Sequence, residues 1–273
     1  MIKRLFFDIE TSYCTGWFWQ PAFKTNITYE QVLKDSAIIC ICYKWEDSKK
    51  TYSLQWEKGN DKAMIKQFYD IVLSADEVVG HNGDKFDLKR FRTRCLLHGI
   101  KSFPEIKSID TLKISRSKFK FKSNRLDNIG KELGFGGKKD TGGIELWHDI
   151  IQRNSKTAMN KMIAYCKRDV ELLEKVFKKL NPYTKHKTHN GVFSGGYKWD
   201  CPECGSSEAV ARKYQVSAAG VESSILSCKP CGRWFTISKS VRKQRDEWVY
   251  DQQKKHRENN GKNAKSFKEF NLE

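Results

Sequence analysis

The stretch MIKRLFFDIETS (residues 1–12) opens the chain with an apolar run that ends in two carboxylates. Its β-branched and aromatic residues predict a strand over residues 2–9. Side chains two apart on a strand point to the same face, so Asp8 and Glu10 would lie side by side and repel each other. Either both carboxylates are exposed or separately paired with bases, or a cation lies between them.

The segments that follow predict a mixed α/β sheet flanked by helices. Runs rich in β-branched and aromatic residues predict strands at 37–45, 51–56, 77–82 and 107–110. Apolar residues at helical spacing predict helices at 61–75, 85–99, 123–134 and 157–180. Strands that come first and then alternate with helices indicate this class of fold.

The composition of the chain changes after residue 182. We expect a medium-sized α/β domain over 1–182 and a polar, Gly-containing linker over 183–197. A small cysteine-rich module is expected over 198–240, followed by a basic, partly helical or disordered tail over 241–273.

The net charge of +18 comes from 51 Lys and Arg against 33 Asp and Glu among 273 residues. This excess predicts a polyanionic partner, most simply nucleic acid. The sequence has no long apolar run and no signal peptide, so we expect no membrane partner and a cytoplasmic protein. The nine cysteines would then stay reduced, as ligands or core residues.

Two further acidic clusters occur at expected helices. Asp87 follows Phe86 in GHNGDKFDLKR (80–90), and Tyr165 and Asp169 in AYCKRDVELLEK (164–175) are one helical turn apart. Each has an ordinary structural explanation by itself. An acidic residue at a helix N-terminus is a common cap, and a Tyr–Asp pair can be a packed side chain beside a solvated one.

In chain order, D-x-E (8–10), N-x-x-x-F-D (82–87) and Y-x-x-x-D (165–169) resemble the three motifs of the DnaQ-like 3′–5′ exonucleases of the RNase H-like superfamily. Tyr165 resembles the DEDDy branch, because Ala164 stands where the DEDDh branch has histidine. The resemblance covers about residues 2–180. The segment GGKKDTGGIELW (136–147) looks most like small phage-encoded exonucleases.

This resemblance implies an RNase H-like fold in which four carboxylates hold two Mg²⁺ or Mn²⁺ ions. The implied ligands are Asp8, Glu10, Asp87 and Asp169, and Tyr165 would orient the attacking water. Oxygen ligands suit these ions rather than zinc, and two cations make crowded carboxylates tolerable. A phenol with a pKa of about 10 is a poor base at neutral pH, so orientation is the favoured role of the tyrosine.

Several side chains are expected to contact the nucleic acid. The aromatic run GWFWQPAF (16–23) suits base stacking, although covering a sheet edge is equally compatible. The expected substrate contacts are Thr11, Trp17, Trp19, Asn82, Phe86, Lys139, Arg212, Lys213 and Arg233. His81 is expected to be a hydrogen-bonded buried histidine, and Asp110 a helix cap.

Two C-x-x-C pairs, CPECG (201–205) and CKPCG (228–232), lie in the cysteine-rich module. Four thiolates suit one closed, structural, tetrahedral Zn²⁺, and the glycine after each pair lets the backbone turn. The predicted ligands of this zinc ribbon are Cys201, Cys204, Cys228 and Cys231. The ribbon would grip nucleic acid, or else dock onto a polymerase or replisome protein.

The favoured function is therefore a metal-dependent 3′–5′ exonuclease, with DNA preferred over RNA, that proofreads or processes ends in a phage-type replication system. A phage-encoded protein would work in the host cytoplasm. A structure-specific RNase H-like endonuclease and a zinc-ribbon nucleic-acid-binding module remain as alternatives. Recognition of RNA depends on contacts to the 2′-OH, and no residue in the sequence indicates one.

Overall fold

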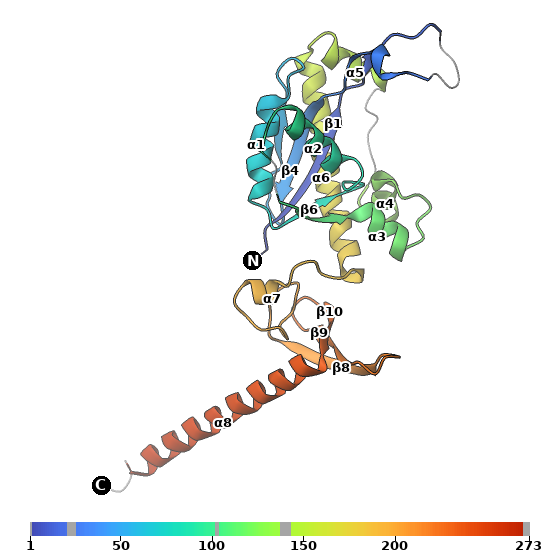
Figure 1. Ribbon diagram of the computed structural model, residues 1–273. Helices are drawn as coiled ribbons and strands as arrows, with labels where there is room; N and C mark the ends of the chain where they lie inside the picture. The colour runs from blue at the N-terminus through green and yellow to red at the C-terminus, as the bar shows by residue number, and fades with distance from the viewer. Residues whose placement is uncertain (1, 21–25, 102–103, 137–142, 270–273) are drawn as a thin grey trace. The chain divides into compact units, whose positions relative to one another are not determined.

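The computed structural model describes residues 2–20, 26–101, 104–136 and 143–269, with side chains described as far as residue 258. Lys139, expected to contact substrate, lies outside the described residues. The chain divides into two compact units, Ile2–Thr184 and Lys185–Glu273 (Figure 1).

A five-stranded mixed sheet forms the centre of the first unit, in the order β5-β4-β1-β6-β7. The strands are β1 (Arg4–Thr11), β4 (Ile38–Trp45), β5 (Tyr52–Gln55), β6 (Glu77–Gly80) and β7 (Lys107–Asp110). β1 pairs antiparallel with β4 and parallel with β6. The predicted mixed α/β sheet is confirmed, with β1 as its central strand.

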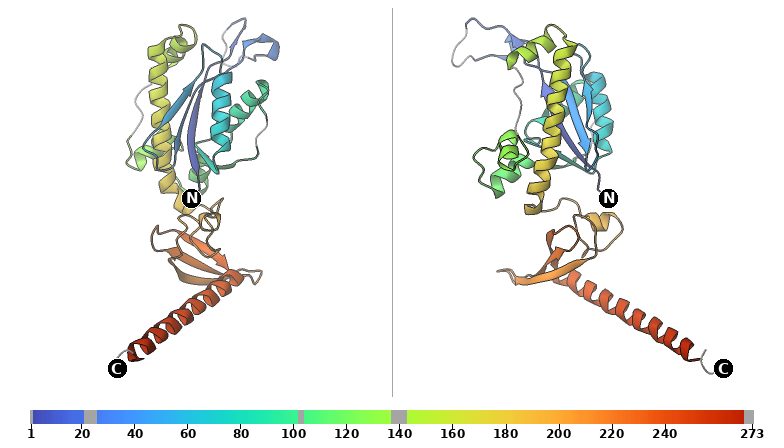
Figure 2. Two further views of the ribbon diagram at one scale, coloured as in Figure 1. Left: turned by 90° about the vertical axis from the view of Figure 1, so that its left-hand side faces the viewer. Right: turned by 180° about the vertical axis from the view of Figure 1, so that it is seen from behind.

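Helix α6 covers one face of this sheet, and α1 and α2 cover the other (Figure 2). The helices are α1 (Lys62–Leu73), α2 (Asp87–Leu97), α3 (Thr111–Lys118), α4 (Leu126–Glu132), α5 (Ile144–Ile151) and α6 (Lys156–Leu180). The shorter elements are β2 (Thr15–Gly16), η1 (Tyr29–Gln31), β3 (Val32–Lys34) and η2 (Asn181–Tyr183). Helix α5 was not predicted. Its eight residues are too few for a stable isolated helix, and packing of its buried residues supports it.

The alternation of side chains along β1 decides what each face of the sheet receives. Phe7 packs against Phe68 of α1 with ring centroids 5.4 Å apart, whereas Phe6 packs against Phe177 of α6 at 5.3 Å. Asp8 is two residues beyond Phe6 and so lies on the α6 side of the sheet. The carboxylates of β1 thus follow Phe6 on the side of the sheet that packs against α6.

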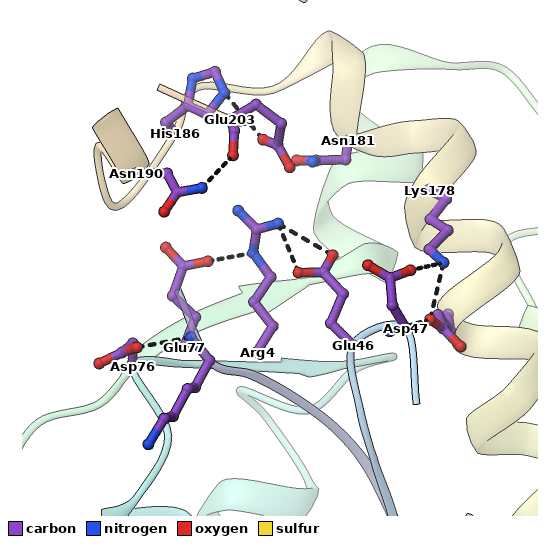
Figure 3. A network of polar contacts seen from close by, with 12 residues as sticks. Arg4, Glu46, Asp47, Asp76, Glu77, Lys178, Asn181, His186, Asn190 and Glu203 are labelled. Carbon is purple, nitrogen blue, oxygen red and sulfur yellow. Dashed lines mark hydrogen bonds and ion pairs between the residues drawn. The ribbon is translucent and has the colours of Figure 1, made fainter. Parts of the chain in front are cut away.

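A buried arginine holds the other end of β1. Arg4, 5% exposed, donates from Nε to Glu77 of β6 at 2.7 Å and from Nη1 to Glu46 at 3.2 Å (Figure 3). Its guanidinium also lies 5.5 Å from the centroid of the Phe177 ring. A buried charge needs such partners, and these tie β1 to β6 and to the turn after β4.

The second unit contains a three-stranded antiparallel sheet in the order β10-β9-β8. Its elements are α7 (Asn190–Phe193), β8 (Ala209–Val216), β9 (Glu222–Cys228), β10 (Trp234–Ser238) and α8 (Lys239–Glu269). Val241 and Trp248 of α8 pack against its small apolar cluster, and Trp199 stacks on Tyr197 at 4.4 Å. The start of the predicted tail therefore belongs to this small core.

Part of the stretch expected as a linker is ordered against the first cysteine pair. The backbone N–H of Asn190 donates to the Pro202 carbonyl, and its side-chain amide donates to the Glu203 carbonyl, both at 2.9 Å. Asn190 is buried. The polar residue Asn190, in the stretch expected as a linker, therefore provides hydrogen bonds to backbone carbonyls of the cysteine-rich module.

Candidate functional site

The carboxylates of β1 lie at the edge of a cavity of about 720 Å³. Asp8 and Glu10 are both half-buried and both line it. A bulge between Glu10 and Thr11 interrupts the pairing with β4, so the regular ladder ends where the carboxylates end. The central strand thus delivers two adjacent acidic groups to one hollow.

Asp87 is the first residue of α2 and is 3% exposed. Its Oδ1 accepts a hydrogen bond from the backbone N–H of Ile9 at 3.2 Å, which places it directly against the acidic end of β1. The turn before α2 contains Asn82 in a left-handed conformation (φ +67°), a conformation that asparagine tolerates. The Asn82 N–H donates to Asp110 Oδ1 at 2.9 Å, which fixes this turn.

Helix α6 brings the third motif to the same cavity. Tyr165 and Asp169, one turn apart, both line it, and Asp169 is 8% exposed. Three segments that are far apart in the sequence therefore meet here: the end of β1, the turn before α2 and one face of α6.

The charges of these residues oppose one another. Burial raises the pKa of Asp8 well above its usual range, and the neighbouring charges of Asp87, Glu10 and Asp169 raise it further. Burial also raises the pKa of Asp87 to about 7, against the lowering effect of the Ile9 N–H bond. A cation bound at the carboxylates would lower the free energy of this arrangement, because it offsets their mutual repulsion.

The donor set fits divalent metal ions of the oxygen-preferring kind. Glu10, Asp87 and Asp169 lie close enough to Asp8 to raise its pKa, and the cavity leaves room for water and for a substrate oxygen. Mg²⁺ and Mn²⁺ prefer carboxylate and water ligands.

Sequence reasoning missed a second wall of the cavity, which comes from α3, α4 and the segment between them. The lining residues there are Leu112, Arg116, Ser123, Asn124, Arg125, Leu126, Asp127 and Asn128. The side chains of Arg116 and Arg125 are exposed and place two positive charges at a site that is otherwise acidic. The only sequence signal was the basic run SRSKFKFKSNR (115–125).

His81 and Asp110 have the structural roles predicted for them. The two ring nitrogens of His81 lie 2.9 Å from Thr111 Oγ1 and 2.9 Å from the Asn124 carbonyl. Burial lowers the pKa of His81. Asp110 accepts from the Leu112 N–H at 2.9 Å and caps α3. His81 therefore holds the Asn124 segment, and with it the second wall, against the end of β6.

Among the expected substrate contacts of the first unit that the structure describes, Asn82 lines this cavity, and Thr11, Trp17, Trp19 and Phe86 do not. Trp17 is 70% exposed, Trp19 is fully exposed and Phe86 is 41% exposed, so each presents a ring to solvent. The Thr11 carbonyl accepts from Trp147 Nε1 at 3.0 Å, which attaches the end of β1 to α5.

The four cysteines of the second unit converge. The Sγ atoms of Cys201, Cys204, Cys228 and Cys231 all lie within 4.8 Å of one another. The glycine after each pair has a left-handed backbone, with φ of +78° at Gly205 and +71° at Gly232. The cluster could hold zinc, and its four sulfur donors suit a closed tetrahedral site.

One expected nucleic-acid contact in this unit is wrong. Arg233 is 3% exposed, and its carbonyl accepts from the Cys228 N–H at 2.8 Å, which fixes its backbone in the second knuckle. Arg212 is exposed but donates to Ser227 Oγ at 2.8 Å, and Lys213 is exposed on the same strand. Arg212 and Lys213 therefore remain available to a polyanion, and Arg233 does not.

Comparison with known proteins assigns the class of the first unit. The RNase H superfamily matches residues 5–181, more than half of the chain, and the chain belongs to this superfamily. A family B DNA polymerase from the hyperthermophilic archaeon Pyrobaculum calidifontis has a similar structure, with a TM-score of 0.52 and 18% identity. The similarity covers 67% of this chain but 25% of the polymerase, and at this identity it supports the fold alone.

No curated protein matches the chain by sequence. Within the described ranges, no helix combines the length and the apolarity needed to cross a lipid bilayer.

Replacing Asp8 by Asn should stabilise the protein when Mg²⁺ and Mn²⁺ are absent. When the pKa of a carboxyl group is higher in the folded than in the unfolded state, the protein loses folding stability as pH rises from the unfolded pKa through the folded pKa. Asp8→Asn should therefore gain on the order of 1 kcal/mol at pH 8 and little at acidic pH, where the native Asp8 stays protonated. Urea unfolding at both pH values measures this difference.

Asp70→Asn, on the exposed face of α1, is the matched control and should change stability little at either pH. A loss of stability in Asp8→Asn at pH 8 would show that the carboxylates are not in conflict.

Removing zinc should unfold the cysteine-rich module and leave the first unit folded, because the apolar cluster of the module is small. Cys231→Ser, or a chelator, should make residues 198–238 sensitive to trypsin while residues 2–184 stay resistant. Cys14→Ser, an exposed cysteine outside both knuckles, should behave as the unaltered chain. Equal resistance in all three samples would mean that the module needs no metal.

Proposed function

We propose that the protein is a two-metal-dependent 3′–5′ exonuclease of the DEDDy type, acting on DNA in preference to RNA. One observation carries this proposal. Asp8, Glu10, Tyr165 and Asp169 line a single cavity, and Asp87 is bonded to the strand between the first two. These are the residues of the three exonuclease motifs, in the order in which that family has them.

The four carboxylates would hold two Mg²⁺ or Mn²⁺ ions. When bound, such a pair of ions supplies an activated water and stabilises the leaving 3′ oxygen of the cleaved bond. The hydroxyl of the half-buried Tyr165, on the turn before Asp169, would orient the attacking water through a hydrogen bond. A phenol, with a reference pKa of about 10, suits this orienting role better than that of the base.

The arginine-bearing wall would hold the strand whose end is cleaved. Arg116 and Arg125 are exposed at the cavity and can each form charge-assisted hydrogen bonds with phosphate oxygens. Trp17 and Trp19 offer stacking surfaces to unpaired bases, and Lys213 with Arg212 adds charge on the ribbon. These features favour a single-stranded or frayed 3′ end.

A structure-specific endonuclease is the second candidate function, because RNase H-like folds support several nuclease chemistries. The tyrosine of the third motif argues for the exonuclease. In a second setting for the same chemistry, the exonuclease would proofread in trans beside a polymerase or replisome protein.

The proposal is tested by incubating the full chain with Mg²⁺ or Mn²⁺ and a 5′-labelled single strand, as DNA and as RNA. We expect a ladder that shortens from the 3′ end, faster on DNA. The ladder should be absent with Asp8→Ala and about 100-fold slower with Tyr165→Phe, which loses the orienting hydroxyl.

Discrete internal cuts in structured substrates would replace the exonuclease by the endonuclease. Tight binding with no cleavage in either metal would reduce the protein to a nucleic-acid-binding module.

Removing either cavity arginine should weaken substrate binding more than turnover. Arg116→Ala and Arg125→Ala should each raise KM about 10-fold, the size expected for a lost hydrogen bond to a charged group, with a smaller change in kcat. Lys66→Ala, an exposed residue of α1 outside the cavity, is the control for general charge. A KM equal to that of this control would exclude the arginines from the substrate path.

A further inference from the structure

Three buried thiols lie beside the carboxylate site and have no part in the proposed hydrolysis. Cys40 and Cys42 of β4 and Cys166 of α6 are each 0% exposed, and their Sγ atoms lie within 4.8 Å of one another. We call these three residues the thiol triad.

The register of the central sheet brings the triad to the carboxylates. Cys42 pairs with Asp8 and Cys40 with Glu10 across β1 and β4, so all four residues point to the α6 side. Helix α6 adds Cys166, the residue after Tyr165.

The triad also contacts a carboxylate oxygen directly. The Cys166 thiol lies 3.5 Å from Asp8 Oδ2 and 3.5 Å from the Asp8 carbonyl. A candidate fourth donor, of a type that zinc also accepts, is therefore next to the sulfur of Cys166.

We propose that the thiol triad, with Asp8 Oδ2 as the fourth donor, binds a thiophilic divalent ion such as Zn²⁺. Zn–S bonds of about 2.3 Å place tetrahedral sulfurs about 3.8 Å apart, so the triad must close by about 1 Å or less. Thiolates bind Zn²⁺ in preference to Mg²⁺ and Mn²⁺, so the ion preferred by the triad differs from the ions preferred by the four carboxylates. Three cysteines in a core can also be plain packing, and the experiment below separates the two.

The ion has a route into this buried site. Asp8 lines the open cavity, and its Oδ2 lies 3.5 Å from the Cys166 thiol. An ion that binds Asp8 from the cavity is therefore already beside the first sulfur of the triad.

An ion bound at the triad uses Asp8 as a ligand, and the proposed nuclease needs the same carboxylate to bind its own ions. Binding at the two sites is therefore antagonistic, and the coupling is reciprocal: Mg²⁺ weakens the thiophilic ion, and that ion weakens Mg²⁺. The resulting inhibition of hydrolysis rests on the proposed function, whereas the binding of the ion does not.

Titration of the full chain with Cd²⁺ tests the site, because the ultraviolet Cd–thiolate band reports sulfur ligands and ignores carboxylates. The unaltered chain should show two saturating steps, one from the four ribbon cysteines and one from the three triad cysteines. Cys42→Ala should lose the triad step and keep the ribbon step as its internal standard. Cys95→Ala, a buried cysteine of α2 outside the triad, should keep both steps.

Asp8→Asn and excess Mg²⁺ should each weaken the triad step and leave the ribbon step unchanged. A single ribbon step in the unaltered chain, identical in Cys42→Ala, would overturn the proposal. A triad step in a chain without nuclease activity under any condition would sustain the metal site and refute the exonuclease. Activity without a triad step would do the reverse.

Discussion

The mutual repulsion of the carboxylates around Asp8 is the constraint on which the first unit depends. Burial and three acidic neighbours raise the pKa of this group, and the fold holds the neighbours in place with bonds such as that from the Ile9 N–H to Asp87. The other end of the same strand shows the contrast, because the buried charge of Arg4 has two acidic partners. One strand thus has a charge-balanced end that supports folding and an unbalanced end that is suited to a cation.

Two kinds of metal chemistry are arranged on this chain by the same elementary rules. Hard carboxylate oxygens gather where strand ends and helices meet, and soft sulfurs gather at the two knuckles and behind β1. The two donor types approach each other where the thiol of Cys166 meets the carboxylate of Asp8. Because Asp8 belongs to both sets of donors, an ion bound at one site changes the affinity of the other site for its ion.

Much of the first unit was predictable because its signals are local. β-branched and aromatic residues identified β1, and the period of two of a strand placed Asp8 and Glu10 on one face. Helical spacing put Tyr165 beside Asp169. Arg116 and Arg125 could not be found this way, since their position depends on how α3 and α4 pack. Arg233 failed for the opposite reason, because a basic residue beside a cysteine pair looks exposed until the knuckle closes over it.

The alternation along β1 also limits how the gene for such a protein can change length. A one-residue insertion between Phe6 and Asp8 would turn both carboxylates toward the α1 and α2 face and away from Asp169. The aromatic contacts of Phe6 and Phe7 prevent the strand from sliding to compensate. Insertions and deletions should therefore accumulate in the connecting loops, and this strand should keep its length as the rest of the chain diverges.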